Sequence, residues 1–289
     1  MGATRETQVI ARGAVELVVE AVGAGPLVVL AHGFPDCPAT FRYQVPALVE
    51  AGFRVATLAM RGYAPSSAAR DGRYDAAALG DDLLAVGEAL SPEARFSLVG
   101  HDWGAIASYA AAARAPSRLA RLITLAVPHL RVALPRFFAP AQLRRSFYML
   151  EFQPRSADAR VRANGFARIE ALWRRWSPGY SPSPEELEAV RAALEPHVEG
   201  PLGYYRALLR PTREVLGLLL ARTRVPAMYL HGVDDGCVDL GLARGCEAAY
   251  ERGCEVVRVR GAGHFLHLER PTEVNGALVR FLGVGRDGG

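Results

Sequence analysis

The chain has 289 residues, half of them hydrophobic, and carries a formal net charge of +4. This length and apolar content suit one large α/β core with an insertion, and they exclude a globally disordered chain. All 34 basic residues are arginine, but they are scattered along the chain rather than gathered in stripes, so we expect no nucleic-acid partner.

The first half of the chain alternates strand-like and helical segments. Apolar, strand-like runs occupy residues 15–20, 27–31, 54–58, 96–99 and 122–127. Helical runs occupy residues 75–90 and 104–113. Continuous apolar strands that alternate with helices are typical of a parallel sheet covered on both faces. In such sheets, sites gather at the carboxyl ends of the strands.

This alternation stops at Pro128. From His129 to Thr223 the sequence favours only helices, with an interruption rich in proline at residues 177–184. Strand-like runs resume at residues 225–230 and 255–259, and a last helix is expected at 272–282. The pattern predicts a core made of residues 1–128 and 224–289, with residues 129–223 inserted as a helical cap.

Cysteine use and the N-terminal sequence indicate the compartment. The four cysteines have neither CxxC nor metal-ligand spacing. Residues 1–6 lack the apolar core of a signal peptide, and no apolar run approaches the roughly 18 residues of a spanning helix. We therefore expect a reduced, cytoplasmic protein with no metal and no membrane partner.

The most informative segment is Gly100-His101-Asp102-Trp103-Gly104, which joins a predicted strand to a predicted helix. Small flanking residues permit a strained turn that lifts the central side chain clear of the sheet. A serine hydrolase has its nucleophilic serine at this point, whereas this chain has Asp102. A carboxylate is ionised at pH 7 and can attack a saturated carbon without a base, forming an ester that water can cleave.

An ester on Asp102 needs a base that activates water, and the base needs an acid that orients it. His264, in a glycine-rich loop after the last predicted strand, is the candidate base. Asp235 follows the preceding strand and is the candidate acid, with Asp234 and Asp239 as rivals. Each residue alone is common in turns and loops. However, the chain order of nucleophile, acid and base, with each residue beyond the end of a strand, is that of the α/β-hydrolases.

The segment His32-Gly33-Phe34-Pro35-Asp36 directly follows the predicted strand 27–31. Backbone N–H groups of Phe34 and Trp103 are predicted to form an oxyanion hole, in which each donor contributes about 3 kcal/mol. His32 and His101 are expected to support these loops rather than to react.

The HGFPD and GHDWGA motifs, with Asp235 and His264, resemble the epoxide hydrolase and haloalkane dehalogenase branch of the α/β-hydrolase fold family. The resemblance covers nearly the whole chain, since Arg61-Gly62-Tyr63 and residues 269–275 also match landmarks of that branch. It implies an α/β-hydrolase fold, that is, a mostly parallel sheet covered by helices on both faces, with an inserted helical cap.

In epoxide hydrolases, two cap tyrosines donate hydrogen bonds to the epoxide oxygen. Residues 146–153 are similar to the first tyrosine segment of that family, which ends in Phe-Gln. Residues 203–206 resemble the second, in which the tyrosine directly precedes an arginine. The resemblance thus carries these roles to Tyr148 and Tyr205, whereas Tyr204 is expected only to pack. A phenol with a pKa of about 10 can donate to an alkoxide while staying protonated at pH 7.

The resemblance implies an epoxide hydrolase that forms vicinal diols without a cofactor, with an epoxide and water as its partners. A haloalkane dehalogenase is the alternative, because the Trp103 indole could bind a halide and Trp173 or Trp176 could supply a second donor. A non-catalytic relative that binds its ligand without turnover is a third possibility. The identity of the epoxide, the selectivity and the oligomeric state are not encoded in these motifs.

Overall fold

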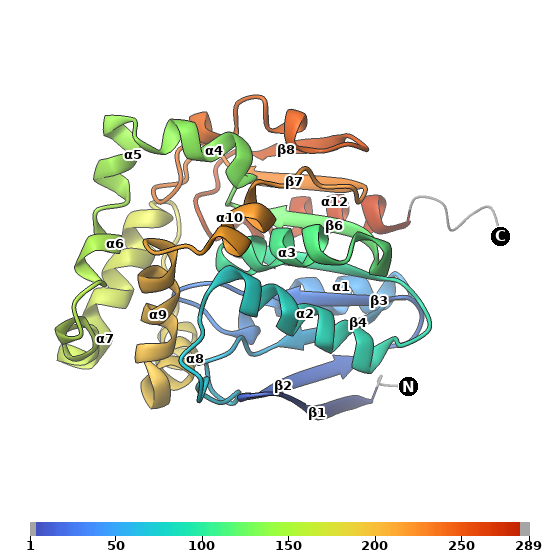
Figure 1. The fold of residues 1–289 in the computed structure, drawn as a ribbon, viewed down its shortest axis with the longest axis horizontal. Helices are drawn as coiled ribbons and strands as arrows, with labels where there is room; N and C mark the ends of the chain where they lie inside the picture. The colour runs from blue at the N-terminus through green and yellow to red at the C-terminus, as the bar shows by residue number, and fades with distance from the viewer. Residues whose placement is uncertain (1–3, 284–289) are drawn as a thin grey trace.

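An eight-stranded sheet runs through the molecule in the order β1-β2-β4-β3-β5-β6-β7-β8 (Figure 1). The computed structural model describes residues 4–283. The strands from β3 onwards are mutually parallel: β3 (Leu27–Ala31), β4 (Arg54–Leu58), β5 (Phe96–His101), β6 (Leu119–Leu125), β7 (Ala227–Gly232) and β8 (Cys254–Val259). The α/β architecture and mostly parallel sheet predicted from the sequence are confirmed.

The first two strands, β1 (Arg5–Arg12) and β2 (Val15–Val22), form a hairpin at one edge of the sheet. β2 runs antiparallel to both β1 and β4. The sequence does not indicate β1, because its charged and polar residues are largely exposed and lack the apolar alternation of a half-buried strand. An edge strand of this kind is held by pairing with its neighbour rather than by burial.

Helices cover both faces of the sheet, as expected for buried parallel strands. In Figure 1, α2 (Ala76–Leu90) and α3 (Trp103–Arg114) lie in front, and α1 (Gln44–Glu50) and α12 (Pro271–Gly283) lie behind. Alternate residues of β3 enter two separate cores: Val29 packs with the α2 and α3 side, and Val28 with the α1 and α12 side. The short helix α11 (Leu266–Glu269) follows β8 and precedes α12.

Between β6 and β7 the described chain is helical, as the sequence predicts. The helices are α4 (Leu130–Phe137), α5 (Pro140–Arg145), α6 (Tyr148–Glu151), α7 (Ser156–Trp176), α8 (Pro184–Leu194), α9 (Glu199–Leu208) and α10 (Arg213–Leu220). Helices α5 to α9 gather beyond one end of the sheet, at the left of Figure 1, whereas α10 lies against α3. This insertion therefore stands over the strand ends where the sequence-predicted site residues lie.

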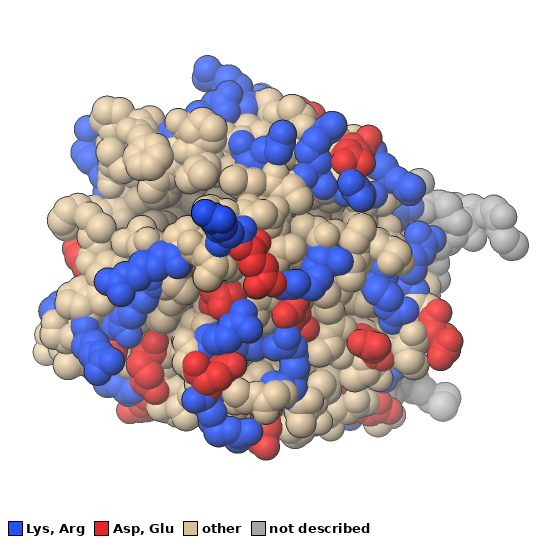
Figure 2. All heavy atoms as spheres, in the orientation of Figure 1, with Lys and Arg blue, Asp and Glu red and all other residues tan. Residues whose placement is uncertain are grey.

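Arginines are interspersed with acidic side chains on the face drawn in Figure 2, rather than forming one stripe. All four cysteines are free thiols. Among residues 4–283, none of the helices combines the length and the apolar content needed to cross a membrane.

Candidate active site

Asp102 lies at the sharp turn between β5 and α3. Its backbone has φ 51° and ψ −114°, which a residue with a side chain rarely adopts. Glycines on either side allow the turn: a Cβ on Gly100 would lie 2.2 Å from the carbonyl oxygen of Gly104, and one on Gly104 would lie 2.0 Å from that of Ala31. The strained turn therefore holds the Asp102 carboxylate just beyond the carboxyl end of a central strand.

The two oxygens of Asp102 have different neighbours. Oδ1 accepts a hydrogen bond of 2.8 Å from the backbone N–H of Phe34. Oδ2 lies 3.4 Å from Nε2 of His264. Trp103 is the first residue of α3, so its N–H has no carbonyl partner within the helix. A side chain at position 33 would disturb this arrangement, because a Cβ on Gly33 would lie 2.4 Å from Asp102 Oδ1.

His264 and Asp235 complete a chain of contacts that starts at Asp102. Nδ1 of His264 donates to Oδ2 of Asp235 over 2.9 Å. Oδ1 of Asp235 accepts hydrogen bonds of 2.6 and 2.8 Å from the N–H groups of Cys237 and Val238. Asp235 is thus fixed on both sides, and the structure brings it, Asp102 and His264 together.

The rival acids lie elsewhere in the same loop. The side chain of Asp234 is exposed. Asp239 accepts from the N–H of Gly241 and lies 3.2 Å from the guanidinium of Arg145. Of the three aspartates, Asp235 is therefore the one whose carboxylate contacts His264.

The pKa values of the three residues are set by burial of the His264 imidazole between the carboxylates of Asp102 and Asp235. Burial opposes the charge on His264, but Asp235 and Asp102 outweigh it and raise the pKa of His264 to about 10. Burial likewise opposes ionisation of Asp102 and Asp235, yet the contact with His264 lowers the pKa of both carboxyl groups. The resting site therefore holds two carboxylates and an imidazolium at pH 7.

A cavity of about 80 Å³ adjoins Asp102. Tyr148 and Tyr205 line it, together with Trp103, Cys237 and mainly apolar side chains from α4, α6 and α9. The buried Tyr205 hydroxyl has no hydrogen-bond partner among the described residues, and the Tyr148 hydroxyl lies 3.5 Å from Sγ of Cys237. Burial raises the pKa of both phenols well above 10, so both stay protonated and can donate.

Packing holds the two tyrosine rings in place. The Phe152 ring makes edge-to-face contacts with both of them, at centroid distances of 5.6 and 5.3 Å. Arg206 donates to the carbonyl oxygen of Phe152 over 3.1 Å and pairs with Asp158 at 2.5 Å. Arg206 therefore connects α9, which carries Tyr205, to the segment that carries Tyr148.

Most of the other residues singled out in the sequence have structural partners. The Tyr204 hydroxyl donates to the carbonyl oxygen of Arg61 over 2.7 Å, as expected of a packing residue. His32 accepts a hydrogen bond of 3.1 Å from the N–H of Met60. The Trp173 indole donates to the carbonyl oxygen of Pro35 over 2.7 Å, whereas the buried Nε1 of Trp176 has no hydrogen-bond partner among the described residues. Neither tryptophan lines the cavity. His101 belongs to a separate polar cluster described below.

The sequence did not reveal how the insertion holds the two loops of the site. The carbonyl oxygen of Trp176 accepts hydrogen bonds of 2.9 Å from Gly236 and 3.0 Å from His264. Ser177 joins the same arrangement, because its hydroxyl accepts from the N–H of Phe265 and donates to Glu269. Any residue can supply a backbone carbonyl acceptor, so the sequence does not identify this contact. The only sign of it in the sequence is the proline-rich interruption after Trp176.

Comparison with known proteins identifies the family to which the chain belongs. The sequence profile described as the alpha/beta hydrolase fold matches residues 26–271. Epoxide hydrolase A of Mycobacterium tuberculosis is 32% identical, with 98% of each chain covered. An epoxide hydrolase of Caballeronia sordidicola is 32% identical over 94% of this chain and 92% of that protein. The crystal structure of epoxide hydrolase A from Mycobacterium thermoresistibile has a TM-score of 0.82 at 30% identity, covering 97% and 99% of the two chains.

The chain belongs to the α/β hydrolase fold family. Within that family it lies in the branch of the epoxide hydrolases, since relatives of that name match it over more than nine-tenths of its length.

Proposed function

We propose that this protein hydrolyses epoxides to vicinal diols through a covalent ester on Asp102. The observation that carries the proposal is that an aspartate occupies the strained turn after β5 while two tyrosines line the same cavity. Residues 129–223 act as the cap that supplies those tyrosines. The names of the relatives from Mycobacterium and Caballeronia point to the same activity.

In the first step, Oδ2 of Asp102 attacks an epoxide carbon and the ring C–O bond breaks. The charge moves to the epoxide oxygen, where the hydroxyls of Tyr148 and Tyr205 donate hydrogen bonds to the alkoxide. The alkoxide becomes a hydroxyl by taking up a proton, and the proton held by His264 in the resting site balances this uptake. The step therefore leaves an uncharged ester on Asp102 and a neutral His264.

In the second step, neutral His264 takes a proton from water, and the resulting hydroxide attacks Cγ of the ester. Negative charge develops on Oδ1, toward which the Phe34 N–H already points at 2.8 Å. The Trp103 N–H is the second proposed donor. When this intermediate collapses, the bond from Cγ to the substrate oxygen breaks, and the leaving alkoxide takes the proton of the new acid hydroxyl to become the diol. This restores the Asp102 carboxylate and leaves the proton from water on His264, which Asp235 holds in position.

The dehalogenase alternative has less support from the geometry. A halide needs two N–H donors at the cavity, and the Trp173 indole is already bonded to the carbonyl oxygen of Pro35. The Trp176 indole N–H is unpartnered among the described residues and its ring packs against Tyr148, but Trp176 lies outside the cavity lining, whereas the two phenols lie within it. A non-catalytic relative would have no use for an aspartate, an imidazole and a second carboxylate in contact.

The cavity suits a small, apolar epoxide, because most of its lining is aliphatic or aromatic. Every proposed step uses side chains and water, so the reaction itself requires no cofactor. We also propose that the protein works in the cytoplasm, where its four free cysteines remain reduced. Neither a nucleic acid nor a membrane is needed as a partner.

A parallel screen of epoxides and haloalkanes tests the proposal. Styrene oxide and small aliphatic epoxides should give diol, and chloro- and bromoalkanes of similar size should give no free halide. The Asp102→Ala variant is the control and should be inactive on both. Halide release by the parent protein without diol formation would replace the proposal with the dehalogenase, and binding without either product would indicate a non-catalytic relative.

A further inference from the structure

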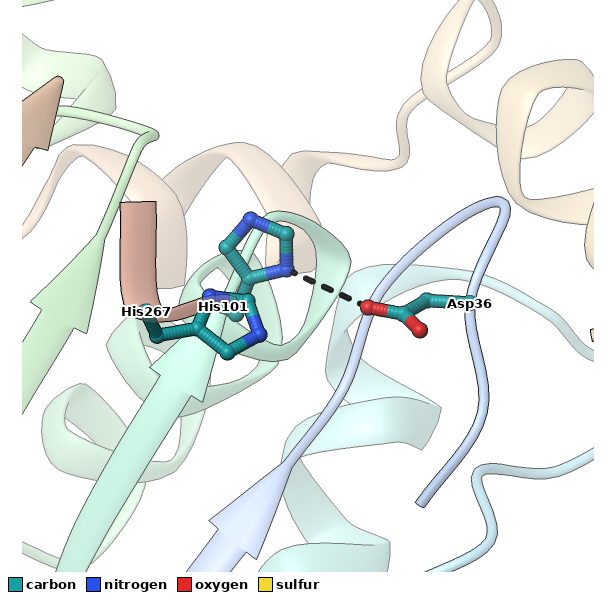
Figure 3. Close-up of side chains that lie close together, drawn as sticks. All are labelled: Asp36, His101 and His267. Carbon is teal, nitrogen blue, oxygen red and sulfur yellow. Dashed lines mark ion pairs between the residues drawn. The ribbon is translucent and has the colours of Figure 1, made fainter. Parts of the chain in front are cut away.

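Asp36, His101 and His267 form a second polar cluster (Figure 3). It lies beside the proposed catalytic residues, because the ring centroids of His101 and His264 are 5.0 Å apart. All three side chains are buried, and one donor atom of each lies within 4.8 Å of those of the other two. Oδ2 of Asp36 is 3.8 Å from Nδ1 of His101. The proposed mechanism uses none of these side chains.

One side of each residue is already hydrogen-bonded. Oδ1 of Asp36 accepts from the N–H of Cys37 over 2.8 Å. Nε2 of His101 lies 2.9 Å from the carbonyl oxygen of His264, and Nε2 of His267 lies 2.6 Å from the Thr40 hydroxyl. A carbonyl oxygen can only accept, so the proton of a neutral His101 is on Nε2 and its Nδ1 presents a lone pair.

The opposite atoms have no hydrogen-bond partner among the described residues: Asp36 Oδ2, His101 Nδ1 and His267 Nδ1. Leaving one buried polar atom unpartnered costs free energy, and here three converge from different segments. A set of two imidazole nitrogens and one carboxylate oxygen is typical of Zn²⁺ and other divalent first-row transition-metal ions. Mg²⁺ and Ca²⁺ instead prefer oxygen ligands alone.

We propose that Asp36, His101 and His267 form a binding site for one divalent transition-metal ion of the zinc type. Ligands about 2.0–2.1 Å from zinc lie roughly 3.3 Å apart in a tetrahedral site, so the ion would draw these side chains together by up to about 1.5 Å. Three protein ligands leave a further coordination position for water. The proposal is independent of the epoxide chemistry.

A surface hollow adjoins one side of the cluster. The hollow has a volume of about 340 Å³, and both Asp36 and Thr40 line it. It lies between the 3-10 turn at Pro38–Phe41 and helix α8. The guanidinium of Arg42 borders the hollow, but its charge is paired with Glu186. The hollow brings solvent close to Asp36, whose side chain is itself buried. Burial raises the pKa of Asp36 to about 8, so the ion would displace a proton from this carboxyl group.

The ion would connect three segments that carry the proposed active site. Asp36 follows Phe34 by two residues, His101 directly precedes Asp102, and His267 follows His264 by three residues. The sequence gives no sign of a metal site here, because Asp36 and His101 lie 65 positions apart and His101 and His267 lie 166 positions apart. Only the fold brings these ligands together.

Cobalt is the probe for the test, because Co²⁺ takes the place of Zn²⁺ and absorbs visible light. The full-length protein, stripped with a chelator and returned to metal-free buffer, should bind one equivalent of Co²⁺ and show ligand-field bands. Zn²⁺ should displace the Co²⁺ and abolish these bands. At free Zn²⁺ of about 100 times Kd, Tm should rise by roughly 5 °C.

His267→Gln and Asp36→Asn should each weaken binding by about 100-fold or more. His197→Gln is the matched control, since His197 is partly exposed in the insertion and lies outside the cluster, and it should bind like the parent. Circular dichroism of the metal-free variants separates lost ligands from lost folding. If the parent binds neither ion, or if both cluster variants fold and bind normally, the site does not exist.

Discussion

The backbone N–H of Phe34 donates a hydrogen bond of 2.8 Å to Oδ1 of Asp102. The two oxygens of this carboxylate are therefore inequivalent before any substrate binds, since Oδ2 faces Nε2 of His264 at 3.4 Å. We infer that Oδ2 attacks the substrate and that Oδ1 becomes the carbonyl oxygen of the ester. The charge of the second step then develops where a fixed donor already points, without reorganisation of the loop.

Replacing His264 with Gln should separate the two half-reactions. Asp102 keeps a carboxylate and can still be alkylated, but water is no longer activated, so the ester accumulates. Mixing this variant with an epoxide should add the mass of one substrate to the intact protein, and digestion should locate the adduct on the peptide that contains Asp102.

The double variant Asp102→Asn with His264→Gln is the control and should stay unmodified. A serine-type mechanism predicts no adduct on the single variant either, because loss of its histidine blocks the first step. An unmodified His264→Gln protein, facing an epoxide that the parent turns over, would therefore rule out direct attack by Asp102.

Tyr148→Phe and Tyr205→Phe should each lower epoxide turnover by about 10- to 100-fold, and the double substitution should nearly abolish it. Each phenol supplies one donor to the same alkoxide, and the remaining phenol compensates only in part. Steady-state kcat and kcat/KM on styrene oxide measure the effect. Full activity of the double variant would contradict the epoxide assignment.

Tyr204→Phe is the matched comparison, because Tyr204 adjoins Tyr205 in the chain but donates to the carbonyl oxygen of Arg61. Its loss should lower the free energy of unfolding by about 1 kcal/mol while leaving kcat within about twofold of the parent value. A large loss of turnover in a folded Tyr204→Phe protein would reassign the alkoxide donor.

Much of the fold could be predicted because its parallel strands are short, apolar and buried on both faces. Strand β3, for example, is observed at the predicted residues Leu27–Ala31. β1 could not be predicted, because an exposed edge strand has no apolar periodicity. Strands β6 and β7 are displaced from the predicted 122–127 and 225–230, because apolar residues continue past the paired segments.

The candidate site was predictable wherever the chemistry depends on a local motif. Asp102 and Phe34 lie in short segments whose glycines are needed for close backbone approach. The sequence separates Asp235 from Asp234 only weakly, because neighbouring aspartates differ only in the direction that the turn gives each side chain. Two other contacts depend on tertiary packing and cannot be predicted from a local pattern. One is the contact of the Tyr148 hydroxyl with Cys237, and the other is the pair of hydrogen bonds that the carbonyl oxygen of Trp176 accepts.

Asp235→Asn should slow ester hydrolysis by on the order of 100-fold or more, because the imidazole loses the carboxylate that orients it and stabilises its charge. Asp234→Asn should change turnover by no more than about twofold, since the Asp234 side chain is exposed. Single-turnover measurements of ester formation and decay distinguish the two steps, and only decay should be affected. A slower decay in Asp234→Asn than in Asp235→Asn would identify Asp234 as the orienting acid.

The pH dependence of the two steps should differ, because esterification changes the surroundings of His264. Burial lowers the pKa of His264, but Asp235 and Asp102 together raise it to about 10 in the resting site. Asp102 loses its charge when it becomes an ester, so one source of the increase disappears and the pKa of His264 must fall. Neutral His264, the form that accepts a proton from water, is then populated at a lower pH than in the resting enzyme.

Alkylation should therefore be nearly constant between about pH 6 and pH 9, because the lowered pKa of Asp102 keeps that carboxylate ionised throughout. Ester decay should instead rise with pH through a pKa below that of the resting His264 and then level off. Rapid-quench experiments with mass detection of the ester measure both rates on one substrate. Ester decay that titrates with the resting value of about 10 would show that Asp102 does not control the charge of His264.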